Sequence, residues 1–426
     1  MLLPQALPAQ CEGATSADAV TGKNIQSFSN WSPRVSATYD LFGNGKTSIH
    51  ASGSYFYNTK ITLANALSGL FTQTRLRWGP NLSSGACNAS SPGCWTDANR
   101  DGIVQTNELI GNPSVSSDRF VNGVLQPAGN IVDPSAQIGR TREAIVGVQH
   151  ELIANLAVGV DYIYRKYDRG TTTYTIGYQP GAGYDQLRAL YQPATYNDPV
   201  TGLSATYYFI CSTCTVPSGL GNITLTNPNY QVYHGVDLTL NKRFSNRWQA
   251  AVALTMQDNP SFFPAGTASF INPTGYEFAN GISTIAKYLF KAQGSYSFPW
   301  DISVSANYNW NQGATRTLSI DGPGSVPGGV GSADGARRTI TYNTLQQQAN
   351  DAFRFDAVHL LDMGVQKAFK FRGGKNRLKL MADGFNMFNE ATIQTYASNN
   401  QSNSGFTQPS AVVPPRVFRF GAAIQF

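Results

Sequence analysis

The stretch DANRDGIVQTNE, from Asp97 to Glu108, carries oxygen-bearing side chains at the spacing of a twelve-residue calcium loop. Such a loop surrounds one hard cation with carboxylate, amide and carbonyl oxygens, and a glycine permits its sharp turn. The candidate ligands are Asp97, Asn99, Asp101, Ile103 (through its carbonyl), Gln105 and Glu108. The sequence therefore predicts a calcium site, with a polar turn that binds no metal as the alternative.

The segments on either side of this loop are SSPGCWT and LIGNPSV, both of which contain helix-breaking residues. An EF-hand sensor has a helix on each side of its loop, so these flanks favour an isolated structural site in a surface loop. Calcium is abundant outside cells, and a weak site suffices there. Structural calcium is the one cofactor that the sequence predicts.

The five cysteines are Cys11, Cys87, Cys94, Cys211 and Cys214. Two close pairs with one residue left over are typical of an oxidising compartment, where disulfides close short loops. Cys87 and Cys94 would hold the calcium loop, and Cys211 and Cys214 would close a second small loop. The alternative for Cys211 and Cys214 is a redox motif or half of a zinc site, but no second such pair follows at zinc-ribbon spacing.

Residues that could support catalysis are few. The four histidines, His50, His150, His234 and His359, fall on four different predicted strands, and none has an evident nucleophile beside it in the sequence. No GxSxG, HExxH or Walker motif is present. The glycine-rich segment 321–335 lacks a strand and helix around it, which predicts a flexible surface loop. We therefore expect no enzymatic activity and no catalytic residues.

The composition of the 426-residue chain is unusual for a soluble protein. Charged residues make up 13% and aromatic residues 12%, yet the mean hydropathy is only −0.24. No apolar run approaches the roughly 18 to 20 residues of a membrane helix. These properties are typical of a transmembrane β-barrel, in which apolar and polar side chains alternate. No Lys/Arg-rich run with interleaved aromatics is present, so nucleic acid is not expected as a partner.

Alternation of apolar and polar residues recurs in segments of about 9 to 11 residues, the length of a tilted membrane strand. In DISVSANYNW (301–310), every second residue from Ile302 to Trp310 is apolar or aromatic and the others are polar. The same pattern occurs in 155–167, 248–257 and 288–298. Half-buried strands of a soluble sandwich are the alternative. Aromatic residues at the strand ends favour the membrane interpretation.

Short and long connections alternate along the chain, which is the sidedness of an outer-membrane barrel with short periplasmic turns and long extracellular loops. The predicted short turns are 40–47, 151–155, 244–248, 298–301 and 371–376. The predicted long loops are about 59–136, 168–229, 258–286, 311–351 and 390–414. This count predicts an all-β, antiparallel barrel with about eleven strands.

Eleven is an odd number, whereas bacterial single-chain barrels contain even numbers of strands, so we expect the C-terminal half of a 22-stranded barrel. The N-terminus lacks the basic region and unbroken apolar core of a signal peptide. The sequence therefore predicts a fragment, with an incomplete remnant at 1–27 and barrel wall at 28–426.

Three segments resemble a known family. They are NWSPRVSATYDLFGNGKTSIHASGSYFY (30–57), LKLMADGFNMFNEATI (378–393) and the terminal RVFRFGAAIQF. All three resemble the Oar-like TonB-dependent receptors, specifically the C-terminal half of their barrel. The resemblance implies the bacterial outer membrane, uptake of a scarce extracellular ligand, and TonB as a partner through N-terminal parts that this chain does not contain.

The resemblance also implies a role for the last strand. An apolar row that ends on an aromatic residue resembles the signal read by the barrel-assembly machinery. This row should contact outer-membrane lipid and consists of Phe418, Phe420, Ala422, Ile424 and Phe426. The neighbouring row, which includes Arg419 and Gln425, should face a watery interior.

Three functions remain open at this point. The first is the barrel of a TonB-dependent transporter, in which the loop segments 174–186, 195–202 and 398–406 either contact the ligand or are simply hydrated loops. The second is a non-transporting surface barrel or adhesin-like protein with calcium-braced loops. The third is a soluble secreted β-protein that binds glycans. The identity of the ligand is not encoded in any motif.

Overall fold

The computed structural model describes the wall strands and most of the connections between them. The described residues are 29–57, 130–133, 135–175, 182–210, 214, 222–264, 278–326, 340–371 and 376–426, together with short strands within 74–126.

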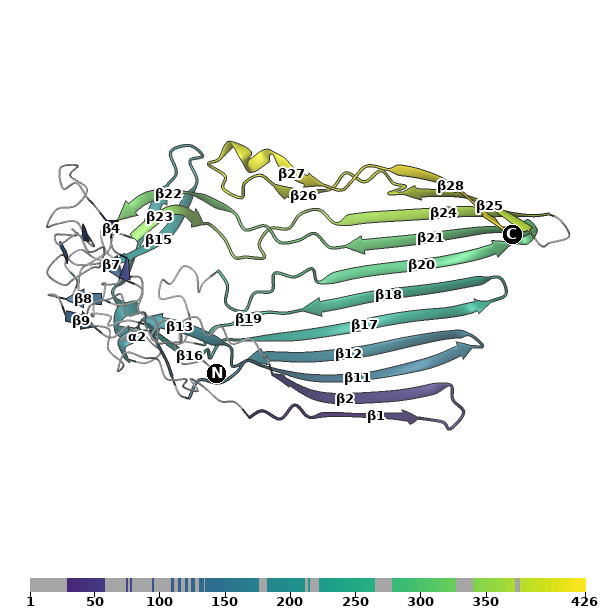
Figure 1. The fold of residues 1–426 in the computed structure, drawn as a ribbon, viewed down its shortest axis with the longest axis horizontal. Helices are drawn as coiled ribbons and strands as arrows, with labels where there is room; N and C mark the ends of the chain where they lie inside the picture. Colours follow the sequence, from purple (N-terminus) through teal and green to yellow (C-terminus); the bar gives the residue numbers. More distant parts are fainter. Residues whose placement is uncertain are drawn as a thin grey trace.

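The fold is one large antiparallel sheet, which we call the wall (Figure 1). Eleven strands follow one another in sequence order, as predicted, and the short strand β19 (Ser261–Phe262) pairs beside β17 as a twelfth. The wall strands are β1 (Arg34–Asp40), β2 (Thr47–Tyr57), β11 (Arg140–Ile153), β12 (Leu156–Asp168), β17 (Tyr230–Ser245), β18 (Trp248–Asp258), β20 (Tyr288–Phe298), β21 (Ile302–Asn311), β24 (Val358–Phe371), β25 (Asn376–Phe385) and β28 (Val417–Gln425).

Tight turns join the strands at one end of the wall, which we call the short-turn end. Between β17 and β18 the two connecting residues, Asn246 and Arg247, have φ values of 50° and 70°. Positive φ at both central residues is the geometry of the two-residue turn whose twist matches that of the strands. The connection between β20 and β21 is equally tight and includes Trp300 and Asp301, with φ values of 66° and 57°.

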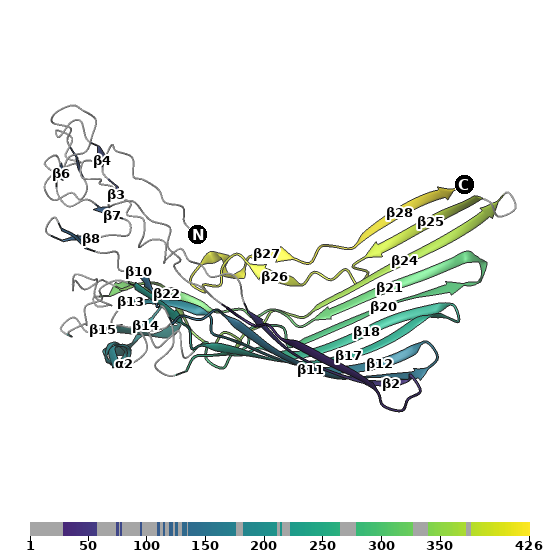
Figure 2. The ribbon, with the colours of Figure 1, turned by 60° about the horizontal axis from the view of Figure 1, so that its bottom comes forward.

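The wall is curved like a trough, and the long connections gather at its other end, the long-loop end (Figures 1 and 2). The C-terminus lies at the short-turn end. Among the described residues, β1 pairs only with β2 and β28 pairs only with β25, so both edges of the wall are open. No helix among these residues is both long and apolar enough to cross a bilayer.

The pairing register keeps side chains of one kind on one face of the wall. One continuous row of directly opposed apolar and aromatic residues crosses six strands and consists of Trp248, Tyr296, Val304, Val365, Ala382 and Phe420. The rows next to it are polar. The alternation predicted from the sequence is therefore confirmed as two distinct faces, the apolar face and the polar face of the wall.

The long connections contain small structures of their own. They include the hairpins β14 (Tyr191–Asn197) with β15 (Ser204–Ile210), β22 (Ser319–Val326) with β23 (Ile340–Gln346), and β26 (Ile393–Tyr396) with β27 (Pro409–Val412). They also include helix α2 (Ala182–Ala189) and a three-stranded sheet of β10 (Asn130–Val132), β16 (Asn222–Thr226) and β13 (Thr171–Thr175). The prediction that 321–335 is a flexible loop was wrong for 321–326, which belongs to β22; residues 327–335 lie outside the described residues.

These connections also contain the small hydrophobic cores of the chain. Ile320 of β22 is fully buried and packs with Ala205 of β15 and Leu345 of β23. A second cluster joins Leu187 of α2 to Ile210 of β15. The first cluster links hairpins that arise from different long connections, because β15 lies beside both β22 and β23.

Candidate functional site

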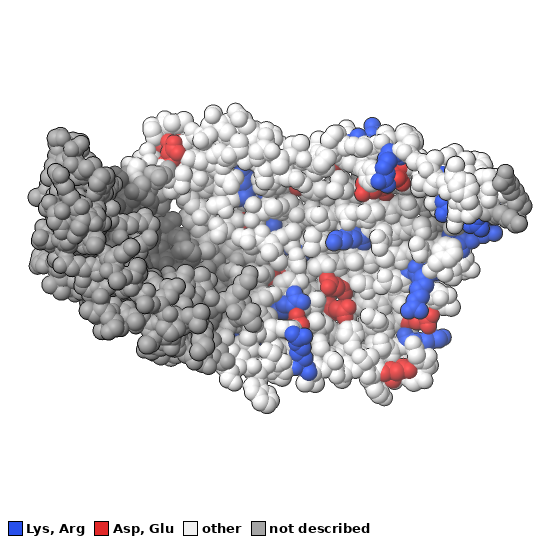
Figure 3. All heavy atoms as spheres, in the orientation of Figure 1, with Lys and Arg blue, Asp and Glu red and all other residues white. Residues whose placement is uncertain are grey.

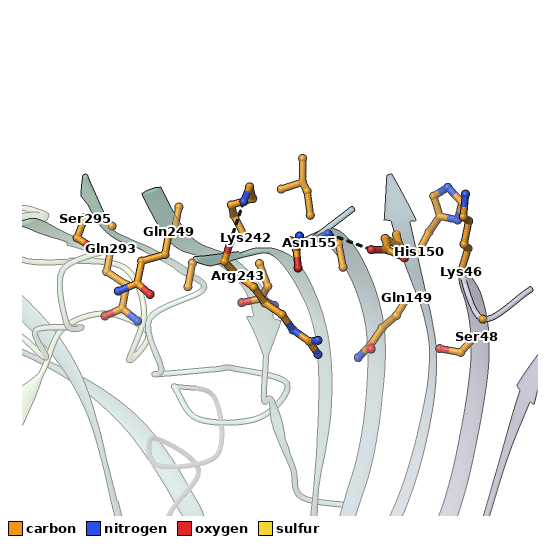
Figure 4. A pocket seen from close by; sticks show the side chains of 18 of the residues that line it. Lys46, Ser48, Gln149, His150, Asn155, Lys242, Arg243, Gln249, Gln293 and Ser295 are labelled. Carbon is orange, nitrogen blue, oxygen red and sulfur yellow. Dashed lines mark hydrogen bonds between the residues drawn. The ribbon is translucent and has the colours of Figure 1, made fainter. Parts of the chain in front are cut away.

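The concave side of the wall is lined by polar side chains. One row of register partners contains small or polar residues only: Ala157, Asn241, Ala251, Gln293, Asn307 and Asp362. On each strand, the residues directly before and after this row point to the apolar face. Towards the short-turn end this face is hollowed, with a volume of about 920 Å³ (Figure 4). Gln149, Arg243, Gln249 and Gln293 extend along this hollow from four different strands. The amides and the guanidinium offer hydrogen-bond donors to whatever fills the trough.

Two aspartates lie opposite each other in the middle of the polar face. Asp161 of β12 and Asp237 of β17 are register partners. His50 Nε2 lies 2.7 Å from Asp161 Oδ1, and Thr255 Oγ1 donates to Asp237 Oδ1 at 2.6 Å. Gly147 makes room for this group, because a Cβ there would lie 1.9 Å from the Asp161 carboxylate and 2.6 Å from the His50 ring.

A second polar chain crosses the same face nearer the long-loop end. Arg165 Nε donates to Glu143 Oε2 at 2.5 Å, and Ser54 Oγ donates to Glu143 Oε1 at 3.3 Å. The Arg165 guanidinium also lies 5.4 Å from the centre of the Tyr233 ring, and the Tyr233 hydroxyl donates to Gln257 at 3.0 Å. Over the middle of this face, positively and negatively charged side chains lie next to one another in small clusters (Figure 3). Such pairs hold side chains in fixed positions on the polar face.

The last strand contributes a further pair. Arg419 of β28 donates to Asp383 Oδ2 of β25 through Nε at 3.0 Å and Nη2 at 2.8 Å. The register places Asp383 opposite Gly364, which lies opposite Ser305, so Arg419 is on the polar face. Phe418 and Phe420 lie on the apolar face, and Phe420 is 80% exposed because β28 is an open edge.

At the long-loop end, three connections meet in a polar cluster that we call the loop junction, centred on Asp198, Thr201, Asp321, Asn400 and Ser402. Asp198 accepts hydrogen bonds from the Thr201 hydroxyl at 2.6 Å and from the Ser402 hydroxyl at 2.8 Å. Ser402 Oγ in turn accepts from the Asp321 backbone N–H, and Asn400 donates to Asp321 Oδ1. The Thr201 hydroxyl, followed by the Ser402 hydroxyl, lowers the pKa of Asp198 below its usual value.

Arg316 also holds connections at the long-loop end together. Its guanidinium lies 4.0 Å from the centre of the Tyr396 ring and 4.2 Å from that of Phe406, and it donates to the carbonyls of Ser398 and Phe406. Burial lowers the pKa of Arg316. Cation–π contacts and carbonyl acceptors together hold the segment 396–406 against the end of β21.

Most of the metal-binding and disulfide residues predicted from the sequence lie outside the described residues. The calcium ligands Asp97, Asn99, Asp101, Ile103, Gln105 and Glu108 lie outside the described residues, as do Cys87 and Cys211. Cys94 falls in the short strand β5 (Cys94–Trp95). Cys214 is disulfide-bonded, but its partner lies outside the described side chains, so the pairing stays a prediction. Within the described part, no three His, Cys, Asp or Glu side chains form a metal site.

The four histidines are separated in the fold, as their positions in sequence indicated. His50 faces the polar side and pairs with Asp161. On the apolar face, His150 is hydrogen-bonded to Thr47, His234 to Tyr162 and His359 to Tyr308. Within the described part of the chain, no two of these histidines are partners; each contacts a carboxylate or a hydroxyl group of another residue.

Sequence analysis did not identify Asp161, Asp237, Glu143 or the loop junction. Acidic residues at polar positions of β11, β12 and β17 were the available signal. Pairing across strands cannot be read from one strand alone, so the partners of these residues emerge only from the fold.

Residues 9–300 match the family described as "Outer membrane beta barrel domain". The TonB-dependent transporter Oar of Myxococcus xanthus is 26% identical over 175 residues, which cover 36% of this chain and 15% of that protein. The outer membrane transporter YddB of Escherichia coli has a TM-score of 0.47 at 11% identity, over 94% of this chain and 41% of that chain. The siderophore receptor PirA of Acinetobacter baumannii has a TM-score of 0.45 at 12% identity, over 94% and 41%.

The chain thus spans less than half of the length of these proteins. The family assignment rests on the sequence match, which covers more than half of the chain and agrees with the all-β antiparallel wall. It also excludes the soluble secreted protein considered from the sequence. The chain belongs to the outer membrane beta barrel domain family and is located in the bacterial outer membrane.

Proposed function

We propose that this chain is part of the wall of a TonB-dependent transporter that takes up a scarce extracellular ligand. The observation that carries the proposal is the polar face, where ordered rows of charged and amide side chains line a trough. A barrel wall that encloses a watery passage needs this distribution, with its apolar face in lipid. The similarity to Oar supports transport, and the function is then uptake without catalysis.

The direction of the edge strands supports closure by further strands. Neighbouring strands run in opposite directions along all eleven, so β1 and β28 run in the same direction. Joining them directly would require a parallel pair, whereas antiparallel closure requires an odd number of additional strands. Eleven more would complete the 22-stranded barrel that the sequence predicts, and lipid would then meet no open edge.

Cross-linking tests this closure. In a background without native cysteines, Ala423→Cys in β28 should form a disulfide with Lys379→Cys, its register partner in β25. Ala423→Cys paired with Thr38→Cys, on the same polar face of β1, should not form one. A β1–β28 cross-link in the protein from outer membranes would show that the eleven strands close on themselves.

Spin labels test the two faces. Val304 and Ser305 are adjacent in β21 and lie on the apolar and the polar face. In the protein from outer membranes, a lipid-soluble relaxant should reach a label at position 304 and a water-soluble relaxant one at 305. Equal access of both relaxants to both labels would contradict a membrane wall. Ligand uptake that persists without TonB would contradict the transporter while leaving the wall intact.

A non-transporting surface barrel with calcium-braced loops is the second candidate, because the loop at 97–108 matches the calcium motif at every ligand position. Under either candidate we propose that Asp97 and Glu108 bind calcium. Millimolar calcium should then protect 59–136 from proteolysis, and Glu108→Gln should remove the protection. Equal cleavage of the wild type in calcium and in chelator would discard the site.

We also propose that the row from Phe418 to Phe426 contacts lipid and is recognised by the barrel-assembly machinery. The row lies on the apolar face of an open edge strand, and free backbone groups of such a strand can pair with another strand. Phe426→Ser should reduce insertion into the outer membrane. Unchanged insertion of the double variant Ile424→Ser/Phe426→Ser would contradict this role.

A further inference from the structure

A group of charged side chains lies on the apolar face of the wall at its long-loop end. On this face of β11, Arg142 and then Arg140 lie beyond Ala144 towards the long-loop end. Their register partners on β12 are Lys166 and Asp168, respectively. The register shows the face, because Arg142 stands opposite Tyr55 of β2 and lies on the same face of β11 as the exposed residues Val146 and Val148. Charged groups on this face mark the height at which hydrocarbon ends and lipid headgroups begin.

Positive charge is in excess in this group. Arg140 donates to both oxygens of Asp168, at 3.0 and 3.1 Å, and Arg142 donates to the same carboxylate. One carboxylate is therefore shared by two guanidinium groups. Lys166 Nζ lies 4.1 Å from the centre of the Tyr230 ring, and none of the ion pairs in the described part of the chain includes it.

The two arginines differ in accessibility. The Arg140 side chain is 14% exposed and is committed to Asp168, whereas the Arg142 side chain is 35% exposed. Arg142 and Lys166 are register partners on adjacent strands, so their cationic heads can contact one anion together. A phosphate group suits this arrangement, since guanidinium and ammonium groups bind phosphate through charged hydrogen bonds.

Two hollows adjoin this cationic group. A groove of about 350 Å³ runs along the apolar face beside Arg142, with Val35, Gly53, Tyr55 and Tyr164 among its lining residues. A second hollow of about 390 Å³ lies across the strand ends beside Arg140, and its lining includes Asn227, Asn229 and Tyr230. The first is suited to a hydrocarbon chain, and the second offers amide groups of the kind that hydrogen-bond to sugars.

We propose that this surface binds a phosphorylated glycolipid of the outer leaflet. Arg142 and Lys166 would contact its phosphate, the groove between β1, β2, β11 and β12 would take an acyl chain, and the hollow at the strand ends would take sugar. A free phosphate would leave the groove empty, and an anionic phospholipid without a sugar would leave the hollow at the strand ends empty. The site lies on the apolar face of the wall, so this proposal does not require the protein to be a transporter.

Co-purification tests the proposal. The protein is extracted from outer membranes in mild detergent, and bound phosphorylated glycolipid is measured by native mass spectrometry. The double variant Arg142→Gln/Lys166→Gln leaves the Arg140–Asp168 pair in place and should lose bound glycolipid by about tenfold or more, the effect of removing two charge-assisted contacts. The control Lys367→Gln/Arg377→Gln removes two positive charges at the short-turn end and should bind like the wild type. Equal lipid in all three proteins would overturn the site.

A second variant separates the groove from the charges. A Cβ at Gly53 would meet no atom within 4 Å, so Gly53→Leu should fold normally and occupy the groove. It should also lower bound glycolipid, with Arg142 and Lys166 unchanged. Rebinding to delipidated protein then compares the glycolipid, its dephosphorylated form and an anionic phospholipid. Preference for the intact glycolipid supports the proposal, whereas equal binding of the phospholipid, or of the dephosphorylated form, would contradict it.

Discussion

The wall exposes its large apolar side chains, whereas the long-loop end buries them. Every large apolar residue that is fully buried among the described residues, such as Ile320 and Ile210, lies in the connections at the long-loop end. Along the wall, large apolar residues such as Val146 and Val365 are exposed. One region therefore forms a hydrophobic core of the kind found in soluble proteins, and the other turns its apolar side chains towards its surroundings. Water around the long connections accounts for their buried cores, and exposed apolar side chains on one face are typical of the wall of an outer-membrane barrel.

The largest effect is expected from a cavity in the loop core. Ile320→Ala should destabilise the packed hairpins by about 2–5 kcal/mol, because the lost side chain is fully buried among Ala205 and Leu345. Ile153→Ala at the end of β11, where the side chain is 62% exposed, should cost much less. Hydrogen exchange of β22 and β23 measures the effect. Equal protection in both variants would mean that the loop core contributes little to stability.

A charge on the apolar face tests the wall. Val252 of β18 stands opposite Leu240 and Ala292, so Val252→Arg should cost about 2–4 kcal/mol if it lies in the bilayer centre. Ala251→Arg, one residue earlier, enters the polar row and should be tolerated. Unfolding by urea in lipid vesicles compares them. Equal destabilisation by the two arginines would show that the faces do not differ in solvent.

A smaller effect is expected from crowding on the polar face. Gly147→Ala places a Cβ against Asp161 and His50, which should move the pair apart and cost about 1–3 kcal/mol. Gly53→Ala on the adjacent strand has open space and serves as the control. The midpoint of chemical unfolding distinguishes them. The predicted close packing around Gly147 is wrong if both variants unfold at the same denaturant concentration.

The smallest effect concerns pH. Because the folded pKa of Asp198 is lowered, its ionised form adds stability above the ordinary carboxyl pKa, and this contribution is lost as pH falls through the lower folded value. The loop junction should therefore loosen between about pH 5 and about pH 2, while the wall stays intact. Proteolysis of the long connections by an acid-active protease measures this. Asp198→Asn should remove that pH dependence; a variant that retains it would assign the effect to another carboxyl group.

Much of the wall was predictable because its information is local. Alternation along segments such as 301–310 gave the strands and their two faces, and short connections such as 244–248 gave the turns. The eleven strands and their order followed, since each tight turn joins sequential neighbours. The site was less predictable. Asp161 and Asp237 are partners only because β12 and β17 pair in one register, across a long connection.

The class of this protein can be recognised from local patterns in its sequence: an antiparallel sheet with an apolar and a polar face, of the outer-membrane type. The period of two along a strand is a property of the backbone and needs no knowledge of distant residues. The folded chain alone reveals which charged groups meet on the polar face, that Ser402 donates to Asp198, and that Arg142 and Lys166 lie together. Such contacts depend on register and on side-chain packing between segments far apart in the chain, which no local pattern specifies.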